Sequence, residues 1–258
     1  MTKFIRDAFI VLRLSFREGR RDMALAFVFP MVPPLFFAVL ISVTFKAVVE
    51  RGGFPTAHYI AWVAPGAVLL PAVIGAGFTA TSTVLDAQSG FLDRLRLLPV
   101  RPGSVLLGRL AFDLVRIVPA TIVVFVSTLA LGAHVGSGFW GALAVVALTL
   151  SLALAWNGIF YVASLRSMNP QTAMALQPLF LPFMFLSTIF VPKEDLPHWA
   201  RLVADLNPIS RLADAARGFM TAPFDGGRLL VAMSFIALIV TVTQAMTLRL
   251  WGNLNSAQ

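Results

Sequence analysis

The chain has 258 residues, of which 58% are hydrophobic and only 12% are charged, and its mean hydropathy is +0.84. A soluble domain of this length would not be so apolar, so the composition excludes a soluble globular protein and indicates an integral membrane protein. The formal net charge is +8, and the chain has no cysteine, which excludes disulfides and thiol chemistry.

The apolar residues occur in unbroken runs of about twenty, which is the length of a helix that spans a bilayer. The strands of a membrane barrel would instead give short segments of alternating hydrophobicity. The sequence therefore predicts an all-α polytopic membrane protein.

Residues 1–22 predict an amphipathic basic helix at the cytoplasmic interface of the membrane. Its apolar face carries Phe4, Ile5, Ala8, Phe9, Leu12 and Phe16, and its basic face includes Arg6, Arg13, Arg17 and Arg20. Such a helix places aromatic side chains in the acyl boundary and arginines on anionic lipid headgroups. Two compatible roles remain open, a simple topogenic anchor and a contact with a cytoplasmic partner. Charges continue to Asp22 without a small-residue cleavage site, so a cleaved signal peptide is not expected.

Residues 23–254 predict one transmembrane domain, followed by a cytoplasmic tail at 255–258. Six hydrophobic segments are long enough to cross a bilayer, at about 24–45, 60–85, 104–131, 139–165, 172–191 and 229–250. Six spans put both termini on the same side of the membrane. Pro170, Pro178 and Pro182 are expected to shorten or kink the fifth span.

The charge distribution predicts which side is cytoplasmic. With both termini, the second-to-third loop and the fourth-to-fifth loop inside, that side holds 13 Lys+Arg and 6 Asp+Glu, against 7 and 6 outside. Because cytoplasmic segments are enriched in Lys and Arg, both termini are expected in the cytoplasm. This asymmetry also accounts for the high isoelectric point without nucleic-acid binding.

The loop between spans two and three, Asp86–Gly103, is rich in charge. We expect a short helix within it, capped by Ser89 and limited by Pro99, with an apolar arc of Phe91, Leu92, Leu95 and Leu98 opposite Asp93, Arg94 and Arg96. A rigid helix held between two spans can move both of them when it is pushed. The alternative is a solvated interfacial turn whose arginines only follow the positive-inside rule.

Arg109, Asp113 and Arg116 lie at spacings of four and three at the start of span three, so Asp113 can pair with either arginine. Charges within a membrane span are costly and often functional. The two interpretations are a structural ion pair and a role in gating or substrate access.

Residues 192–228 predict two short helices on the outer side. Asp195 and Ser210 are the expected caps, Trp199, Leu202, Val203 and Leu206 form a stripe, and Asn207-Pro208 separates the helices. An amphipathic pair lying on the outer leaflet is one interpretation of this pattern.

Two stretches together resemble the ABC type-2 exporter permeases, especially their daunorubicin-resistance branch. The first is Gly90-Phe-Leu-Asp-Arg-Leu-Arg-Leu-Leu-Pro-Val-Arg-Pro102 with Gly108-Arg109, and the second combines Phe190-Val-Pro-Lys-Glu-Asp-Leu-Pro-His-Trp199, Leu206-Asn-Pro-Ile-Ser-Arg211 and Asp214-Ala-Ala-Arg-Gly218. With the six-span plan and the basic N-terminal helix, the resemblance covers nearly the whole chain. Asp86 and Asp93 depart from the glutamates that many family members carry.

The resemblance implies a separate cytoplasmic ATPase subunit, which binds ATP and Mg, and two permease subunits in each complex. It implies that the ATPase docks near the N-terminal helix and the Asp86–Gly103 loop, through Gly90, Phe91, Leu92, Asp93, Arg94, Leu95, Pro99 and Arg101. It also implies that the outer helices are re-entrant and roof the pathway, with Pro192, Leu196, Pro197, Trp199, Asn207 and Pro208 at an extracellular gate. The expected location is the plasma (inner) membrane of a bacterium.

The residues themselves do not predict an enzyme. A nucleotide-hydrolysing subunit needs a glycine-rich phosphate loop that ends in Gly-Lys-Ser/Thr, and the lysines Lys3, Lys46 and Lys193 do not lie in that context. His58, His134 and His198 are widely separated and form no zinc motif, so neither a metal nor a cofactor is expected on this chain.

The substrate class is inferred from the phenylalanines of two spans and from the resemblance. Phenylalanines in spans one and five can line a path for an apolar drug or lipid, or can face acyl chains and neighbouring helices. The resemblance favours a hydrophobic drug or lipid-like substrate. A polysaccharide or glycolipid exporter and a non-transporting membrane scaffold or assembly factor are the alternatives.

Overall fold

The structure is a computed structural model that describes residues 2–21, 27–28, 31–49, 59–89 and 102–256. Every regular element in these ranges is helical. The helices are α1 Thr2–Arg21, α2 Val32–Val49, α3 Tyr59–Ala67, α4 Leu70–Ile74, α5 Phe78–Gln88, α7 Pro102–Ala130, α8 Gly138–Ser167, α9 Gln171–Leu176, α10 Phe180–Phe185, α11 His198–Leu206, α12 Pro208–Thr221 and α13 Gly226–Ser256, with 3₁₀ turns η2 Gln177–Leu179 and η3 Lys193–Asp195. The prediction of an all-α protein is therefore confirmed for the described residues.

Four segments of the described chain are long and apolar enough to cross a membrane: 59–88, 103–130, 138–167 and 226–253. They coincide with the predicted second, third, fourth and sixth spans. The predicted first span includes residues 24–26 and 29–30, which lie outside the described part. The predicted fifth span is divided into α9, η2 and α10. The count of six spans therefore stays a prediction.

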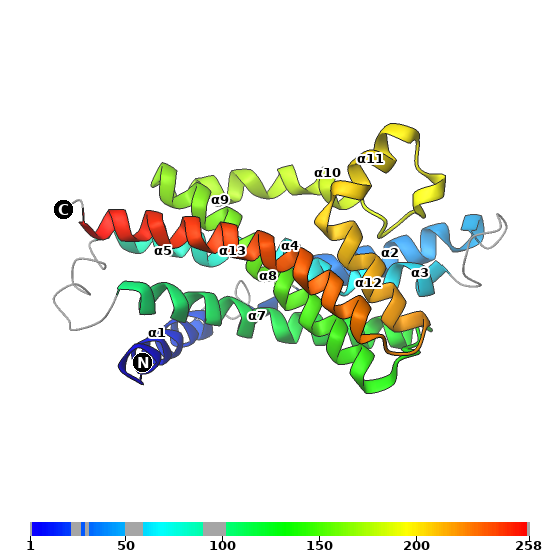
Figure 1. Cartoon of the computed structure of the whole chain (residues 1–258), viewed down its shortest axis with the longest axis horizontal. Helices are drawn as coiled ribbons and strands as arrows, with labels where there is room; N and C mark the ends of the chain where they lie inside the picture. The colour runs from blue at the N-terminus through cyan, green and yellow to red at the C-terminus, as the bar shows by residue number, and fades with distance from the viewer. Residues whose placement is uncertain (1, 22–26, 29–30, 50–58, 90–101, 257–258) are drawn as a thin grey trace.

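The long helices lie roughly along one axis of the molecule (Figure 1). The start of α1, the end of α5, the start of α7 and the end of α13 gather at one end, and α11 lies at the other (Figure 1). At the first end, Gln88 Nε2 donates to the carbonyl of Met168, 2.8 Å away, beyond the end of α8. At the opposite end, the amide of Gly136 donates to the carbonyl of Met220 at 2.7 Å. These contacts fix which helix ends meet.

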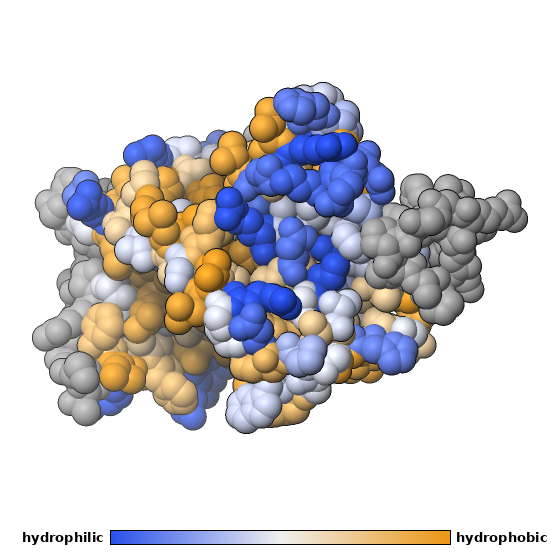
Figure 2. Space-filling view, turned by 45° about the vertical axis from the view of Figure 1, so that its right-hand side comes forward, coloured by the Kyte–Doolittle hydropathy of each residue, from blue (hydrophilic) through white to orange (hydrophobic). Residues whose placement is uncertain are grey.

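The core is centred on α8, whose Leu148, Leu152 and Phe160 are fully buried. Helix α13 packs along α8 and turns Leu230 and Leu238 outward, with exposed fractions of 70% and 67%. On the face seen in Figure 2, hydrophobic side chains spread over the long helices, whereas hydrophilic ones gather toward η3 and α11. A broad apolar exterior of this kind suits contact with lipid or with another membrane subunit.

The segment 59–88 is not one continuous helix, although the sequence predicted a single span there. Turns at 68–69 and 75–77 separate α3, α4 and α5. Pro71 has no backbone N–H to continue the ladder from α3. Gly77 adopts a left-handed φ of +89°, and a Cβ at this position would lie 2.8 Å from the Phe160 ring. Pro71 and Gly77 therefore interrupt the helix in this segment, and a larger residue at position 77 would be strained.

The helices at 171–185 are interrupted at two of the three prolines that were expected to kink the predicted fifth span. Pro178 lies in η2 and Pro182 in α10, and neither can donate a backbone hydrogen bond to the preceding turn. The segment accordingly changes from α-helix to 3₁₀-helix and back, and α10 ends at Phe185.

Candidate functional site

Two ionisable residues of α7, Asp113 and Arg116, are buried in the bundle, each with 1% of its surface exposed. Asp113 Oδ1 lies 3.4 Å from Arg116 Nη2 and also accepts a hydrogen bond from the hydroxyl of Thr79 on α5. Arg116 donates in addition to the carbonyl of Gly75, in the turn between α4 and α5. The pair thus joins α7 to both sides of the break in segment 59–88. Because an unpaired charge inside a bilayer is very costly, each of these residues requires the other.

Arg109 contacts a different partner. Its guanidinium pairs with Asp86 near the end of α5 and donates to the hydroxyls of Ser82 at 3.2 Å and Thr83 at 3.0 Å. The sequence allowed Asp113 to pair with either arginine, and the structure assigns it to Arg116, because Asp86 lies close to Arg109 across the helix pair. Two arginines and two aspartates make this polar cluster electrically neutral overall.

The α5 side of the cluster was not predicted, although the sequence carries a signal for it. Thr79, Ser82, Thr83 and Asp86 follow the spacing i, i+3, i+4, i+7, which places four polar side chains on one face of a helix in an otherwise apolar span. That face packs against α7. We refer to these four residues with Arg109, Asp113 and Arg116 as the α5–α7 polar cluster.

The predicted docking loop starts directly after this cluster. Gly90, Phe91, Leu92, Asp93, Arg94, Leu95, Pro99 and Arg101 lie outside the described residues. The residues on either side are described: Ser89 ends α5, its hydroxyl donating to the carbonyl of Asp86 at 3.1 Å, and Pro102 begins α7. The two helices that flank the loop are therefore the two that the polar cluster joins.

Helix α1 packs against the first half of α7. Its buried face carries Asp7, Ala8, Val11 and Ser15, and a Cβ on Gly108 of α7 would lie only 2.6 Å from the Ala8 carbonyl oxygen. On the predicted apolar face, Ile5, Phe9 and Phe16 are exposed, Phe9 to 57%, whereas Phe4 and Leu12 are half-buried and Ala8 belongs to the buried face.

The four predicted interface arginines, Arg6, Arg13, Arg17 and Arg20, are exposed. The helix thus has three faces, of which the aromatic and the basic one were predicted from the sequence. The third face, which contains mostly small residues, explains how α1 approaches α7 so closely.

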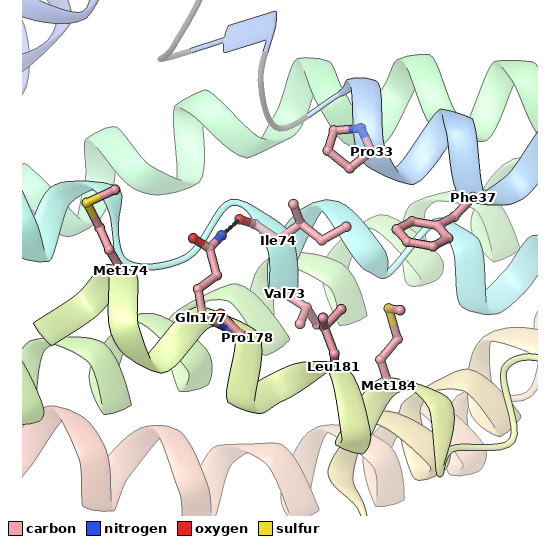
Figure 3. Close-up of a pocket in the computed structure, with 9 residues that line it drawn as sticks. All are labelled: Pro33, Phe37, Val73, Ile74, Met174, Gln177, Pro178, Leu181 and Met184. Carbon is pink, nitrogen blue, oxygen red and sulfur yellow. Dashed lines mark hydrogen bonds between the residues drawn. The ribbon is translucent and has the colours of Figure 1, made fainter. Parts of the chain in front are cut away.

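Two adjoining cavities lie between the broken segments 59–88 and 171–185. The first, which we call the α10 cavity, has a volume of about 310 Å³ and is lined by Pro33, Phe37, Val73, Ile74, Met174, Gln177, Pro178, Leu181 and Met184 (Figure 3). The second, the α5 cavity, has about 470 Å³ and is lined by Ile74, Gly75, Ala76, Gly77, Thr81, Ser82, Leu85, Arg116, Ala173, Met174 and Gln177. Ile74, Met174 and Gln177 border both. Both volumes lie in or near the range of small-molecule sites.

Helix α12 is held to α3 by Arg217. Its guanidinium lies 3.7 Å from the centre of the Trp62 ring and donates to Asp214 Oδ1 at 2.5 Å and to the Thr188 carbonyl at 2.7 Å. Burial lowers the pKa of Arg217 from its ordinary value, and the carboxylate of Asp214 opposes that shift. The i, i+3 spacing of Asp214 and Arg217 was visible in the sequence, but the contact with Trp62 joins positions too far apart in the chain to be read there.

The expected caps of the outer helices were wrong. Asp195 lies in η3 and α11 begins after Pro197, while the cap of α12 is Asn207, whose Oδ1 accepts from the amide of Ile209 at 3.0 Å. Ser210 is buried instead, and its hydroxyl accepts from the amide of Thr188 at 3.3 Å. Asn207 also donates to the carbonyl of Phe183 at 2.6 Å, so it ties α12 to α10.

The six predicted gate residues do not share one environment. Pro192, Leu196 and Asn207 are buried, Pro208 is half-buried, and Pro197 and Trp199 are exposed. The side chains of the stripe, Trp199, Leu202 and Leu206, are exposed. On the other side of α11, Ala200 and Ala204 are buried in a cluster with Leu196. Their role in gating stays a prediction.

No group of three or more His, Asp or Glu side chains that could hold a metal ion occurs in the described ranges.

Comparison with known proteins identifies the family of the chain. The ABC-2 type transporter family matches residues 6–221. The chain is 29% identical over 226 residues to the daunorubicin resistance ABC transporter permease protein DrrB1 of Streptomyces coeruleorubidus, covering 86% of this chain and 78% of the relative. It is 25% identical over 157 residues to the probable doxorubicin resistance permease DrrC of Mycobacterium tuberculosis, covering 61% of this chain and 57% of the relative. It is 26% identical over 180 residues to the probable multidrug permease YbhR of Escherichia coli K12, covering 67% and 47%. The resemblance noted in the sequence is confirmed: the chain belongs to the ABC-2 type transporter family.

Proposed function

We propose that this chain is the membrane subunit of an exporter driven by ATP that a separate cytoplasmic subunit binds, with Mg, and hydrolyses. The observation that carries the proposal is the family match over residues 6–221, together with relatives named as drug-resistance and multidrug permeases. The complex contains a second permease, either another copy or a paralogue, and exports a hydrophobic drug or lipid-like molecule from the cytoplasm or inner leaflet.

The proposed topology has six spans and both termini in the cytoplasm of a bacterium. The charge asymmetry of the sequence supports this orientation. The start of α1 and the end of α13 lie at the same end of the molecule, as an even number of spans requires (Figure 1).

The proposed coupling path runs from the Asp86–Gly103 loop into the bundle. The polar cluster supports it, because Arg109 pairs with Asp86 of α5 and Arg116 bonds the Gly75 carbonyl in the turn before α5, so that both are joined to the first half of α7. Helix α1 packs on the same part of α7. A force applied to the loop would therefore move α1, α5 and α7 together rather than bend one helix.

The test is association with the ATPase. Changing Arg94 and Leu95 together to Glu reverses one charge and removes one apolar side chain, so we expect the chain to lose at least 90% of the ATPase that co-purifies with the unchanged permease. The matched control changes the Arg201-Leu202 pair of α11, at the opposite end of the molecule, to Glu in the same way, and association should persist. Normal association and export by the Arg94/Leu95 variant would contradict the docking role.

A further inference from the structure

The side chain of Gln177 lies between the two cavities. Its Nε2 donates to the carbonyl oxygen of Ile74 over 2.6 Å, and this bond crosses the space between η2 and α4 (Figure 3). Gln177 and Ile74 border both cavities, so their contact is the place where the cavities meet.

Local chain structure holds the amide in this position. Ile74 is the last residue of α4, and carbonyls at a helix end lack partners within the helix. Gln177 follows directly after α9, at the start of the 3₁₀ turn that contains Pro178. The bond to Ile74 uses one N–H of the amide, and Figure 3 shows the amide oxygen turned away from Ile74. The oxygen and the second N–H are the groups with which a bound molecule could form hydrogen bonds.

Gln177 has an apolar cavity lining on one side, and on the other side a lining whose charged residue is already paired. Phe37, Val73 and Leu181 line the α10 cavity. The α5 cavity is bordered by Arg116, but this arginine already pairs with Asp113 and bonds the Gly75 carbonyl. A charged ligand would find no unpaired counter-ion in the described lining, and burying its charge would be costly.

We propose that the two cavities form one binding site within a single permease subunit, for an uncharged apolar molecule whose carbonyl or hydroxyl group bonds the Gln177 amide. The inference rests on the proposed exporter function and specifies the substrate class. The apolar body occupies the α10 cavity against Phe37 and Leu181, and Gln177 fixes its polar group at the junction. The bond to Ile74 holds the amide ready for the ligand, so little side-chain entropy is lost on binding.

Benzophenone is a suitable probe, because it is uncharged and apolar, carries one carbonyl, and forms covalent adducts with nearby C–H bonds under ultraviolet light. The full-length permease in lipid nanodiscs, with and without the ATPase, is photolabelled over a range of benzophenone concentrations, and the adducts are located by peptide mass spectrometry. We expect saturable labelling of the peptides containing Met174, Leu181 and Met184. Adducts on the exposed face of α13 should instead rise without saturation, as lipid-dissolved probe requires.

The change Gln177→Met keeps the size of the side chain and removes its hydrogen bonds. We expect its half-saturating benzophenone concentration to rise at least fivefold. Diphenylmethane, which lacks the carbonyl, should compete equally well in both proteins, and the anionic 4-benzoylbenzoate should label the site at least tenfold less.

The matched control is Gln244→Met on α13. Gln244 Nε2 also donates to a backbone carbonyl of another span, that of Leu154 at 2.9 Å, and does not border either cavity. Its half-saturating concentration should stay within twofold of the unchanged protein.

Three results would overturn the site: labelling without saturation in the unchanged complex, equal half-saturation in Gln177→Met, or an equal loss in Gln244→Met. A Gln177 that only caps α4 would lower the unfolding temperature without changing half-saturation. Failure of the exporter proposal is distinguishable, because it would leave the labelling intact while no ATPase associates with the chain.

Discussion

At the scale of single residues, the most informative feature is the neutral set of charges within the bundle. Asp113 and Arg116 have almost no exposed surface, and their partners include the Thr79 hydroxyl and the Gly75 carbonyl. Removing one partner of a buried ion pair leaves the other charge uncompensated, whereas replacing both with apolar side chains removes the problem. The pair therefore specifies how α7 meets the broken segment more than it adds stability.

A double-mutant cycle tests whether Asp113 and Arg116 depend on each other. Asp113→Leu and Arg116→Met should each lower the free energy of unfolding by about 3–5 kcal/mol, whereas the double variant should lose less than either. Stability is measured by denaturant titration of the purified permease in detergent. The exposed pair Lys193–Asp205, whose side chains are 44% and 48% exposed, is the control. Removing either of its members should cost less than about 1 kcal/mol. Additive losses at Asp113 and Arg116 would contradict the coupling.

At the scale of elements, the breaks in 59–88 and 171–185 determine the shape of the candidate site. Both cavities lie where a continuous helix is interrupted, at the turn 75–77 and at η2. An unbroken span would bond its own carbonyls, and neither Arg116 nor Gln177 could then reach the carbonyls of Gly75 and Ile74.

Gly77→Ala tests the break in segment 59–88. The substitution places a side chain at a left-handed φ, which costs roughly 1 kcal/mol or more, and its Cβ would also meet the Phe160 ring. Gly132→Ala is the matched control, because Gly132 has a similar φ of +103° and no atom within 4 Å of an added Cβ. We expect Gly77→Ala to lower the unfolding temperature clearly more than Gly132→Ala. Equal effects would mean that the contact with Phe160 does not limit this position.

The sequence predicted the elements well where one local rule decides them. The length of the hydrophobic runs predicted the four segments that are long and apolar enough to cross a membrane. The prolines at 170–182 predicted the interruption of the helix at 171–185. The break at 75–77 was missed, because the turn depends on Gly77 facing Phe160 of a distant helix. The caps failed for a related reason: Ser210 has a typical capping side chain, but Thr188 bonds it from another segment. The spacing of the polar residues in the sequence was enough to predict the polar face of α5. The pairing of Asp86 with Arg109 depends on how α5 packs against α7, so it could not be predicted from spacing alone.

At the scale of the whole molecule, contacts connect the two ends of the bundle. At one end, α1 and α5 each pack against α7. At the other, Arg217 joins α12 to Trp62 at the start of segment 59–88 and to the Thr188 carbonyl. Segment 59–88 takes part in both sets of contacts, and the cavities lie beside its middle part. We therefore expect movement at the loop to reach the cavities mainly through this segment.

The proposed function is ATP-driven export by this chain together with a separate ATPase. The most direct measurement is the accumulation of hydrophobic drugs and lipids in inside-out membrane vesicles that contain the permease, the ATPase, both or neither. We expect accumulation of at least one uncharged apolar compound only when both subunits and ATP are present, and we expect the Arg94→Glu/Leu95→Glu variant to lose it. Equal accumulation without the ATPase or without ATP would contradict this function.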